Sequence, residues 1–250
     1  MIYGLYESAA GMMTTEYRQA VLANNLANAD TVGFKRDVAV FAERVPAAQA
    51  GLREGPSAPD LEGLSGGLWL GRTYTDFSVG DKIRTDNPLD VVIENQGFLS
   101  VDAGGQRMFT RDGRMMLDPD GRLVAVTDGA PILGRGGFPI QLNPRGGRPS
   151  IDEDGRVFQD GAMVGELETV NFPADVPLLK TGDARVIAPD GTAFAVAPQV
   201  QSGYVESSGA RPLTELVSMI EASRAYQMNA QMLSLQDQTA GRLITAVMRA

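Results

Sequence analysis

Both ends of the chain carry apolar and small residues spaced alternately by three and four positions, which is the spacing of a heptad seam. The seam of the N-terminal segment consists of Tyr6, Ala10, Met13, Tyr17, Ala20, Asn24 and Ala27. This segment contains no proline, and Gly33 beyond it is a residue suited to a turn. The pattern predicts an amphipathic helix from residue 1 to about residue 28.

The C-terminal segment repeats this pattern over a longer distance. Its seam consists of Leu216, Met219, Ser223, Tyr226, Ala230, Leu233, Asp237, Ala240, Ile244 and Val247. Pro212 stands where a helix can begin, and no glycine follows until Gly241. A continuous helix over residues 212–249 would be about 57 Å long at 1.5 Å per residue, whereas an N-terminal helix of about 24 residues would reach only about 36 Å.

The middle of the chain has the character of β-structure. Its Asp-Gly pairs begin at Asp112, Asp120, Asp128, Asp154, Asp160 and Asp190. Asp-Gly favours the primed turns that connect antiparallel strands, so this spacing predicts short hairpins. Prolines between residues 119 and 149 favour strand edges and corners over a broad flat sheet. We expect a compact antiparallel β-domain, barrel-like or sandwich-like.

Glycine and proline are concentrated between residues 46 and 67 without apolar periodicity, which indicates an extended connector. The predicted fold class is therefore α+β. Residues 1–35 and 210–250 are expected to form a terminal coiled-coil helical domain, a stalk made by the first and last helices. Residues 36–67 are the expected connector, and residues 68–209 the expected central β-domain.

The unequal lengths of the two predicted helices imply an association surface. The shorter helix cannot cover the longer one, so apolar surface near Leu233, Ile244 and Val247 would stay exposed in an isolated molecule. This predicts that the helices complete their burial against neighbouring copies. The alternative left open by the pattern is that each helix simply covers the core of its own domain.

Composition excludes several kinds of chemistry. The chain has no cysteine and no histidine, which removes thiolate chemistry, disulfides and imidazole acid–base catalysis. The acidic loops at Asp118 and Asp152 lack the twelfth-position ligand of a calcium loop, so no metal or cofactor is expected. A net charge of −9 argues against nucleic-acid binding. No apolar run predicts direct membrane insertion, and residues 1–17 contain no cleavable signal pattern.

Two terminal motifs closely resemble those of bacterial flagellar rod and hook axial proteins. The N-terminal motif is ANNLANADTVGFKR at residues 23–36, preceded by SAAGM at residues 8–12. The C-terminal motif is QSGYVESSG at residues 201–209, followed by LVSMIEASRAYQMN at residues 216–229. These motifs follow one another in the order of the family.

The middle of the chain extends the resemblance. NPLDV at residues 87–91, GFL at residues 97–99 and FTRDG at residues 109–113 are similar to the β-domain landmarks of the same family. The resemblance spans nearly the whole chain. It implies a structural axial subunit of the flagellar basal body, not an enzyme, which polymerises helically into the rod that transmits torque from the motor to the hook.

The resemblance also implies partners and a location. The partners would be further copies of the chain, other rod and hook axial proteins and the flagellar type III export apparatus. The location would be the periplasmic rod of the basal body, reached without a cleaved signal peptide, and no cofactor is implied. Length and connector are most similar to proximal-rod members, whereas the asparagine-rich motif and Tyr204-Val205-Glu206 are equally similar to distal-rod members.

Within this interpretation, both helices carry candidate interface residues. The N-terminal candidates are Tyr6, Ala10, Met13, Tyr17, Ala20, Asn24, Asn25, Leu26 and Asn28. The C-terminal candidates are Leu216, Met219, Ile220, Tyr226, Asn229, Leu233, Ile244 and Val247. The asparagines would set register at some cost in stability, or else cap the helix end and face solvent.

Four junction residues follow the first helix. Gly33 is expected to supply a backbone conformation that side chains disfavour, and Phe34 is expected to be buried. Lys35 and Arg36 would meet the negative end of the preceding helix or an acidic neighbour, or else remain solvated. The competing function is a hydrolytic or carbohydrate-binding β-domain with a helical dimerisation stalk.

Overall fold

The computed structural model describes residues 2–43, 45, 67–189 and 191–249. The chain folds into two compact units. The first unit comprises Met1–Ala27, Asp37–Asp76 and Arg211–Ala250, and the second comprises Asn28–Arg36 and Phe77–Ala210. Two terminal helices and mostly antiparallel sheets make the protein α+β.

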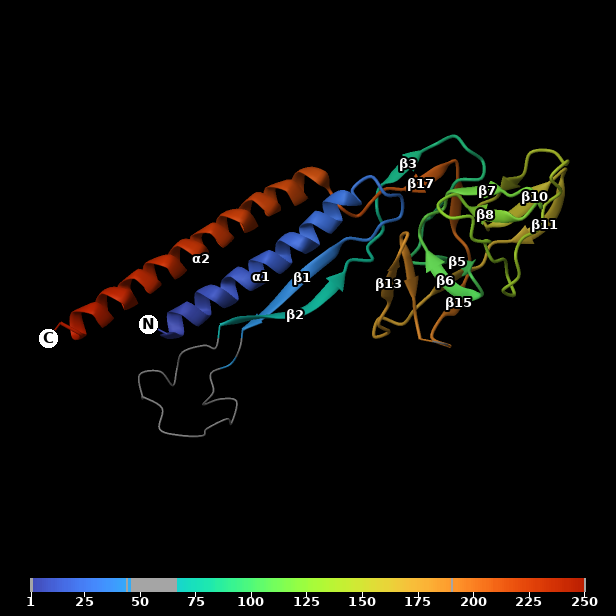
Figure 1. Ribbon diagram of the computed structural model, residues 1–250. Helices are drawn as coiled ribbons and strands as arrows, with labels where there is room; N and C mark the ends of the chain where they lie inside the picture. Colours follow the sequence, from blue (N-terminus) through green and yellow to red (C-terminus); the bar gives the residue numbers. More distant parts are fainter. Residues whose placement is uncertain (1, 44, 46–66, 190, 250) are drawn as a thin grey trace. The chain divides into compact units, whose positions relative to one another are not determined.

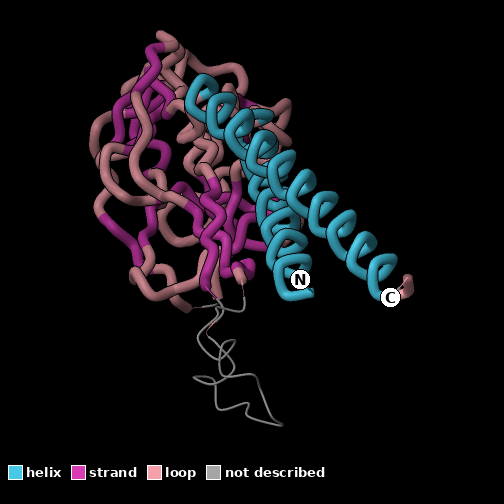
Figure 2. Tube along the Cα trace, turned by 90° about the vertical axis from the view of Figure 1, so that its left-hand side faces the viewer, coloured by secondary structure: helices cyan, strands magenta, loops and turns pink. Residues whose placement is uncertain are grey.

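Helix α1 (Ile2–Ala27) and helix α2 (Pro212–Val247) belong to the first unit and confirm the two predicted helices. Pro212 lies in the first turn of α2, where its missing N–H costs no hydrogen bond. The helices lie side by side and antiparallel (Figures 1 and 2). Among the described residues, no helix combines the length and the apolar character needed to cross a membrane.

Strands β1 (Asp37–Glu43) and β2 (Leu68–Thr75) form an antiparallel hairpin in the first unit. The register runs from the pair Asp37 and Thr75 to the pair Glu43 and Leu68, with an irregularity between Ala39 and Phe41. The predicted connector therefore contains a strand at its start, and residues 46–66 lie outside the described part of the chain. The hairpin falls with the helices, whereas the sequence placed β2 in the β-domain.

The second unit consists of short strands. They are β3 (Lys82–Arg84), β4 (Val91–Ile93), β5 (Phe98–Ala103), β6 (Gln106–Thr110), β7 (Met115–Leu117), β8 (Leu123–Ala125), β9 (Ser150–Ile151), β10 (Arg156–Gln159), β11 (Ala162–Glu166), β12 (Thr169–Asn171), β13 (Leu179–Gly182), β14 (Arg185–Ile187), β15 (Phe194–Val196), β16 (Val200–Ser202) and β17 (Tyr204–Glu206). The largest sheet is six-stranded, in the order β13-β14-β6-β5-β12-β15.

The six-stranded sheet is covered on both faces. Because successive side chains on a strand point to opposite faces, β5 sends Leu99 and Val101 into one apolar cluster and Phe98 into another. The Phe98 cluster is aromatic: the ring of Phe172 packs edge-on against Phe98 at 5.7 Å and against Phe109 at 4.9 Å. Burial on both faces fixes the strand register, because a one-residue slip would exchange the two sets of side chains.

The Asp-Gly pairs play more than one role. Asp160 and Gly161 both have positive φ and join β10 to β11 in a tight hairpin, as predicted. The prediction of a hairpin at Asp112 is wrong, because β6 pairs with β5 and β14 while β7 pairs with β8. A Cβ on Gly113 would lie 1.8 Å from the carbonyl oxygen of Val91, so this glycine permits a close approach of two backbones.

Candidate assembly surface and junction cluster

The contact between α1 and α2 is made by small and polar residues. A Cβ on Gly4 would lie 2.8 Å from Nε2 of Gln236, and one on Gly11 would lie 3.0 Å from Nδ2 of Asn229. Each glycine of α1 thus faces an amide side chain of α2, and the two pairs are seven residues apart on both helices. Ser8, which stands between the two glycines in the sequence, is buried. The helices are close because α1 has no side chains at these points.

The apolar seam predicted on α1 does not face α2. Tyr6 and Met13 are 74% and 70% exposed, and Ala20 and Asn24 are exposed as well. At 3.6 residues per turn, these positions lie on the opposite side of α1 from Gly4 and Gly11. The predicted seam of α1 is therefore not the side that meets α2, whereas Met219, Tyr226 and Leu233 of the α2 seam are half-buried.

The hairpin covers another side of α1. Ala10 and Tyr17 are half-buried there, and the Tyr17 hydroxyl lies 2.5 Å from Oγ1 of Thr73. The Asn25 amide, 1% exposed, donates to the carbonyl of Asp37 and accepts from its N–H at 2.8 and 2.9 Å. Asn25 therefore joins α1 to the start of β1 within the subunit, while Leu26 remains half-buried.

Helix α2 has two kinds of surface. Glu215 and Ala222 are buried, and the predicted residues Met219, Tyr226, Asn229 and Leu233 are half-buried on or beside the same face. Leu216 and Ile220 are exposed, with Ile220 on the side directly opposite Ala222.

The end of α2 extends past α1. Since Gly4 lies beside Gln236, the last turns of α2 continue beyond the first residue of α1 at Ile2. Ile244 and Val247 in these turns are 61% and 75% exposed. The prediction that the shorter helix leaves apolar surface uncovered is confirmed at Ile244 and Val247 but is wrong at Leu233, which is half-buried.

The junction residues lie in the second unit, against the C-terminal motif. Gly33 has φ = 68°, and a Cβ there would lie 2.5 Å from backbone atoms of Arg111 and Asp112. No residue with a side chain fits this position without displacing that backbone. Phe34 is buried, and the Lys180 ammonium lies over its ring at 4.2 Å. The predicted conformation of Gly33 and burial of Phe34 are both confirmed.

Backbone hydrogen bonds join the same segment to the residues after β17. The Gly33 N–H donates to the carbonyl of Glu206 at 2.9 Å, and the Gly209 N–H donates to the carbonyl of Phe34 at 2.8 Å. Asn28 is half-buried, and its carbonyl accepts a hydrogen bond from the Ser208 hydroxyl at 2.8 Å.

Lys35 finds an acidic partner within the protein. Its ammonium lies 2.5 Å from Oε1 of Glu206, and Nε of Arg111 lies 2.6 Å from Oε2 of the same carboxylate. These side chains are 5%, 1% and 2% exposed respectively for Lys35, Glu206 and Arg111. We call these three residues the junction cluster. Arg36, the remaining predicted junction residue, is half-buried.

The charge of Glu206 is stabilised by its neighbours. Burial alone would raise the pKa of this carboxyl, but the positive charges of Arg111 and Lys35 lower it, as do hydrogen bonds from Lys35 and from the Gly80 N–H. The net effect is a pKa below the ordinary value for glutamate. Glu206 is therefore ionised at neutral pH despite its burial.

Glu206 and Arg111 were not among the site residues named from the sequence. Both stand in motifs that carried the resemblance, Glu206 in QSGYVESSG and Arg111 in FTRDG, while Lys35 ends GFK. The fold brings one residue from each of the three motifs to a single carboxylate. The available signal was that the motifs contain charged residues whose signs can balance, although Arg36 and Asp112 in the same motifs left the pairing open.

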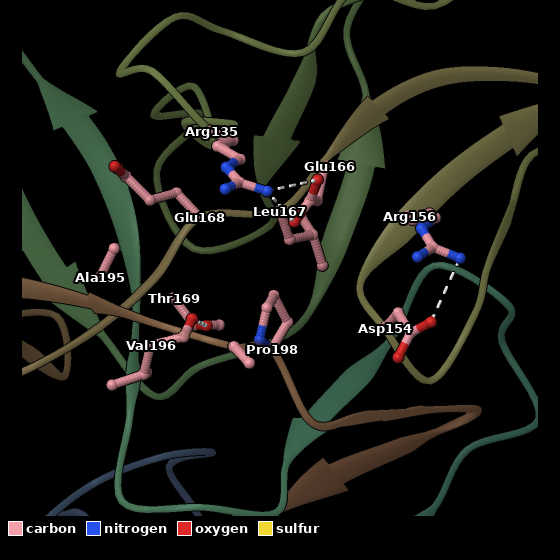
Figure 3. Close-up of a pocket in the computed structure, with 11 residues that line it drawn as sticks. Arg135, Asp154, Arg156, Glu166, Leu167, Glu168, Thr169, Ala195, Val196 and Pro198 are labelled. Atoms are coloured by element: carbon pink, nitrogen blue, oxygen red, sulfur yellow. Dashed lines mark hydrogen bonds and ion pairs between the residues drawn. The ribbon is translucent and has the colours of Figure 1, made fainter.

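A polar cleft of about 350 Å³ lies elsewhere in the second unit (Figure 3). Arg135 and Glu166 approach to 3.4 Å at its rim, and Arg156 and Asp154 approach to 3.2 Å. Glu168, which also lines the cleft, is paired with Arg107 at 2.5 Å, so the charged side chains of the lining all have partners. Within the described part of the chain, no three acidic side chains are grouped closely enough to hold a metal ion.

The fold defines an α+β protein with one unit of paired terminal helices and a hairpin and a second unit of short strands. Three family matches cover its parts. Residues 5–35 match "Flagella basal body rod protein", residues 92–159 match "Flagellar hook protein FlgE/F/G D1 domain", and residues 201–246 match "Flagellar basal body rod FlgEFG protein C-terminal".

Whole-chain relatives agree with these matches. The flagellar basal-body rod protein FlgF of Caulobacter vibrioides is 34% identical over 98% of this chain and 96% of the relative. FlgG of Buchnera aphidicola is 31% identical over 97% of this chain and 99% of the relative, and FlgF of Mesorhizobium japonicum is 29% identical over 92% and 91%. The chain belongs to the flagellar basal-body rod protein family, of the FlgF/FlgG type.

Proposed function

We propose that this chain is a structural axial subunit that polymerises through its terminal helices into the flagellar rod, which carries torque from the motor to the hook. The observation that carries the proposal is the distribution of polarity on the helix pair. Gly4, Gly11, Gln236 and Asn229 meet inside the pair, whereas large apolar side chains face outward. An isolated two-helix unit would be expected to bury its apolar side chains instead.

The outward apolar side chains are numerous enough to drive association. On α2 they are Leu213, Leu216, Val217, Ile220, Met228, Met232, Leu235, Leu243, Ile244 and Val247. Burying one such side chain completely contributes about 1.5–3 kcal/mol, so a contact that covers three or four of them supplies several kcal/mol. We call this set the outer α2 surface.

The exposure of each candidate residue supports a narrower proposed interface. On α1 it comprises the exposed residues Tyr6, Met13, Ala20 and Asn24, and the outer α2 surface is the proposed complementary set. Asn25 is not part of the proposed surface because its amide is hydrogen-bonded to Asp37. Ala10, Tyr17, Leu26, Asn28, Met219, Tyr226, Asn229 and Leu233 are half-buried and would contribute at the margins.

Partners and location follow from the family. The proposed partners are further copies, other rod and hook axial proteins and the flagellar type III export apparatus, and the proposed location is the periplasmic rod, reached without a cleaved signal. Of the two rod types we favour FlgF. Support comes from Caulobacter vibrioides, whose FlgF is 34% identical to this chain and whose FlgG is 29% identical.

The test is assembly of the full-length chain with one outer α2 residue changed. We expect Ile220→Arg to abolish high-order species in sedimentation, because assembly would bury an unpaired charge, while thermal melting of the monomer stays unchanged. The control is Gln106→Arg, an exposed polar position on β6 of the second unit, outside the proposed interface. Normal assembly of Ile220→Arg, with its monomer intact, would overturn the outer α2 surface as the interface.

The competing hydrolytic or carbohydrate-binding function gains no support from the comparisons, which all match structural flagellar proteins.

A further inference from the structure

The chain passes between its two units at four places: after residues 27, 36, 76 and 210. In the second unit, the segments that begin or end at these places are residues 28–36, the residues from Phe77 onward, and those up to Ala210. If the apolar core alone held the unit together, these three segments would need no polar contacts with one another. Each of them is nevertheless joined to another of the three by hydrogen bonds or an ion pair.

The bonds between these segments converge on the junction cluster. Lys35 Nζ donates to the Ser78 carbonyl at 2.5 Å, and the Gly80 N–H donates to Oε1 of Glu206 at 2.7 Å. Lys35 and Glu206 themselves come from the first and last segments. The Glu206 carboxylate therefore connects all three crossing segments. It lies on the last one and accepts from the Lys35 ammonium of the first and from the Gly80 backbone amide of the second.

The other donors of the cluster reach the body of the unit. The Arg111 guanidinium donates to the carbonyls of Ile93, Asn95 and Gly97, which lie between the end of β4 and the start of β5. The arginine thus connects the carboxylate to the sheet. Its guanidinium carbon also lies 5.8 Å from the centre of the Phe98 ring, so Arg111 is the member of the junction cluster that contacts the aromatic core cluster.

We propose that Glu206, Lys35 and Arg111 are positioning residues that clamp the crossing segments of the chain to the β-unit, independently of its apolar core. A buried ion cluster adds little stability beyond what apolar residues of similar volume would supply, but its hydrogen bonds fix direction and distance. The clamp therefore determines where the chain enters and leaves the second unit. This property goes beyond assembly, since it belongs to the single subunit.

The test measures hydrogen exchange in dilute full-length protein carrying Lys35→Met. The reporters are the amides of Gly33 and Gly80, whose acceptors belong to Glu206, and the amide of Gly209, whose acceptor is the carbonyl of Phe34 next to Lys35. We expect their exchange to accelerate tenfold or more, while the amides of Leu99 and Val101 in β5 exchange as in the wild type. The control is Lys82→Met, which removes a partly exposed ion pair with Glu94 and should leave all five amides unchanged.

Equal acceleration at the β5 amides would overturn the proposal, because it would mean that the cluster stabilises the whole unit. No acceleration at the reporters would also overturn it. The Glu206→Gln and Glu206→Gln/Lys35→Met variants provide a second measurement. Adding Lys35→Met to Glu206→Gln should accelerate the reporters far less than it does in the wild type, and equal effects would contradict the clamp.

Should Glu206→Gln fail to fold, the locality of the Lys35→Met effect decides by itself. All these measurements use monomer, so their failure leaves the proposed role in the rod untouched. Conversely, an assembly defect at Ile220 would not bear on the clamp.

Discussion

At the scale of single residues, glycine and glutamate carry the most specific requirements. Gly33 has a positive φ and lies directly against the backbone of Arg111. A residue with a side chain would therefore be unfavourable there for two separate reasons, the backbone conformation and the steric clash. Glu206 is buried with two cations whose charges offset the cost of removing the carboxylate from water. Both requirements are local in space, although the residues involved are far apart in sequence.

The lowered pKa of Glu206 predicts a pH dependence of stability. The unfolded chain binds a proton at the ordinary glutamate pKa of about 4.3, whereas the folded chain binds it only at lower pH. The contribution of Glu206 is therefore complete above about pH 4.3 and is lost as the pH falls through the lowered value.

Urea unfolding of the wild type and Glu206→Gln between pH 7 and pH 2.5 measures this contribution. We expect the difference in unfolding free energy between the two proteins to be constant near neutrality and to shrink in acid. A difference that is independent of pH would show that the glutamate charge does not contribute.

At the scale of elements, α1 makes different contacts along its length. Gly4 and Gly11 meet α2, and Tyr17 and Asn25 meet the hairpin, whereas Tyr6, on nearly the same side as Tyr17 but closer to the start of the helix, is exposed. The heptad pattern identified the side that carries Tyr6 and Tyr17 and left the glycine side unnoticed. Glycine lowers helix propensity by about 1 kcal/mol relative to alanine, so two glycines in α1 are tolerated because close helix packing needs them.

Gly11→Leu tests this close packing. We expect the new side chain to force α2 away from α1 at Asn229, at a cost of about 1–3 kcal/mol that exceeds the gain in helix propensity. Helical amides in the monomer should then lose protection in hydrogen exchange. Ala20→Leu, at an exposed position of the same helix, is the control and should preserve protection. Equal protection in both variants would mean that the helix contact is loose.

At the scale of the whole molecule, neither unit is continuous in sequence. The β-unit includes residues 28–36, which follow the first helix, and the helical unit includes the hairpin of β1 and β2. A fragment cut at the predicted β-domain boundary, residue 68, would lack Gly33 and Lys35 and leave Glu206 with only one of its cations.

Two fragments test this organisation. One joins residues 28–36 to residues 77–210 through a short Gly-Ser linker, and the other contains residues 77–210 alone. We expect the joined fragment to be a folded monomer, while the shorter one is less stable by about 3 kcal/mol or more, because it buries an incompletely paired carboxylate. Equal urea midpoints for the two fragments would contradict the role of residues 28–36 in the unit.

Local chemistry was sufficient to determine several features of this protein from its sequence. Helix periodicity identified both terminal helices and the exposed residues Ile244 and Val247, Asp160-Gly161 identified a hairpin, and Gly33 identified a special backbone conformation. Each of these depends on neighbours within a few positions, where bond geometry and turn preferences dominate.

Only the tertiary structure decided which surfaces meet. Periodicity shows that a helix has an apolar side, but it does not show which segment of the chain packs against that side. In this protein α2 packs against the side of α1 that carries Gly4 and Gly11, more than two hundred residues away in the sequence. The same reason explains the junction cluster. Lys35, Arg111 and Glu206 attract one another only after folding has removed water from around them, and no spacing along the chain encodes that proximity.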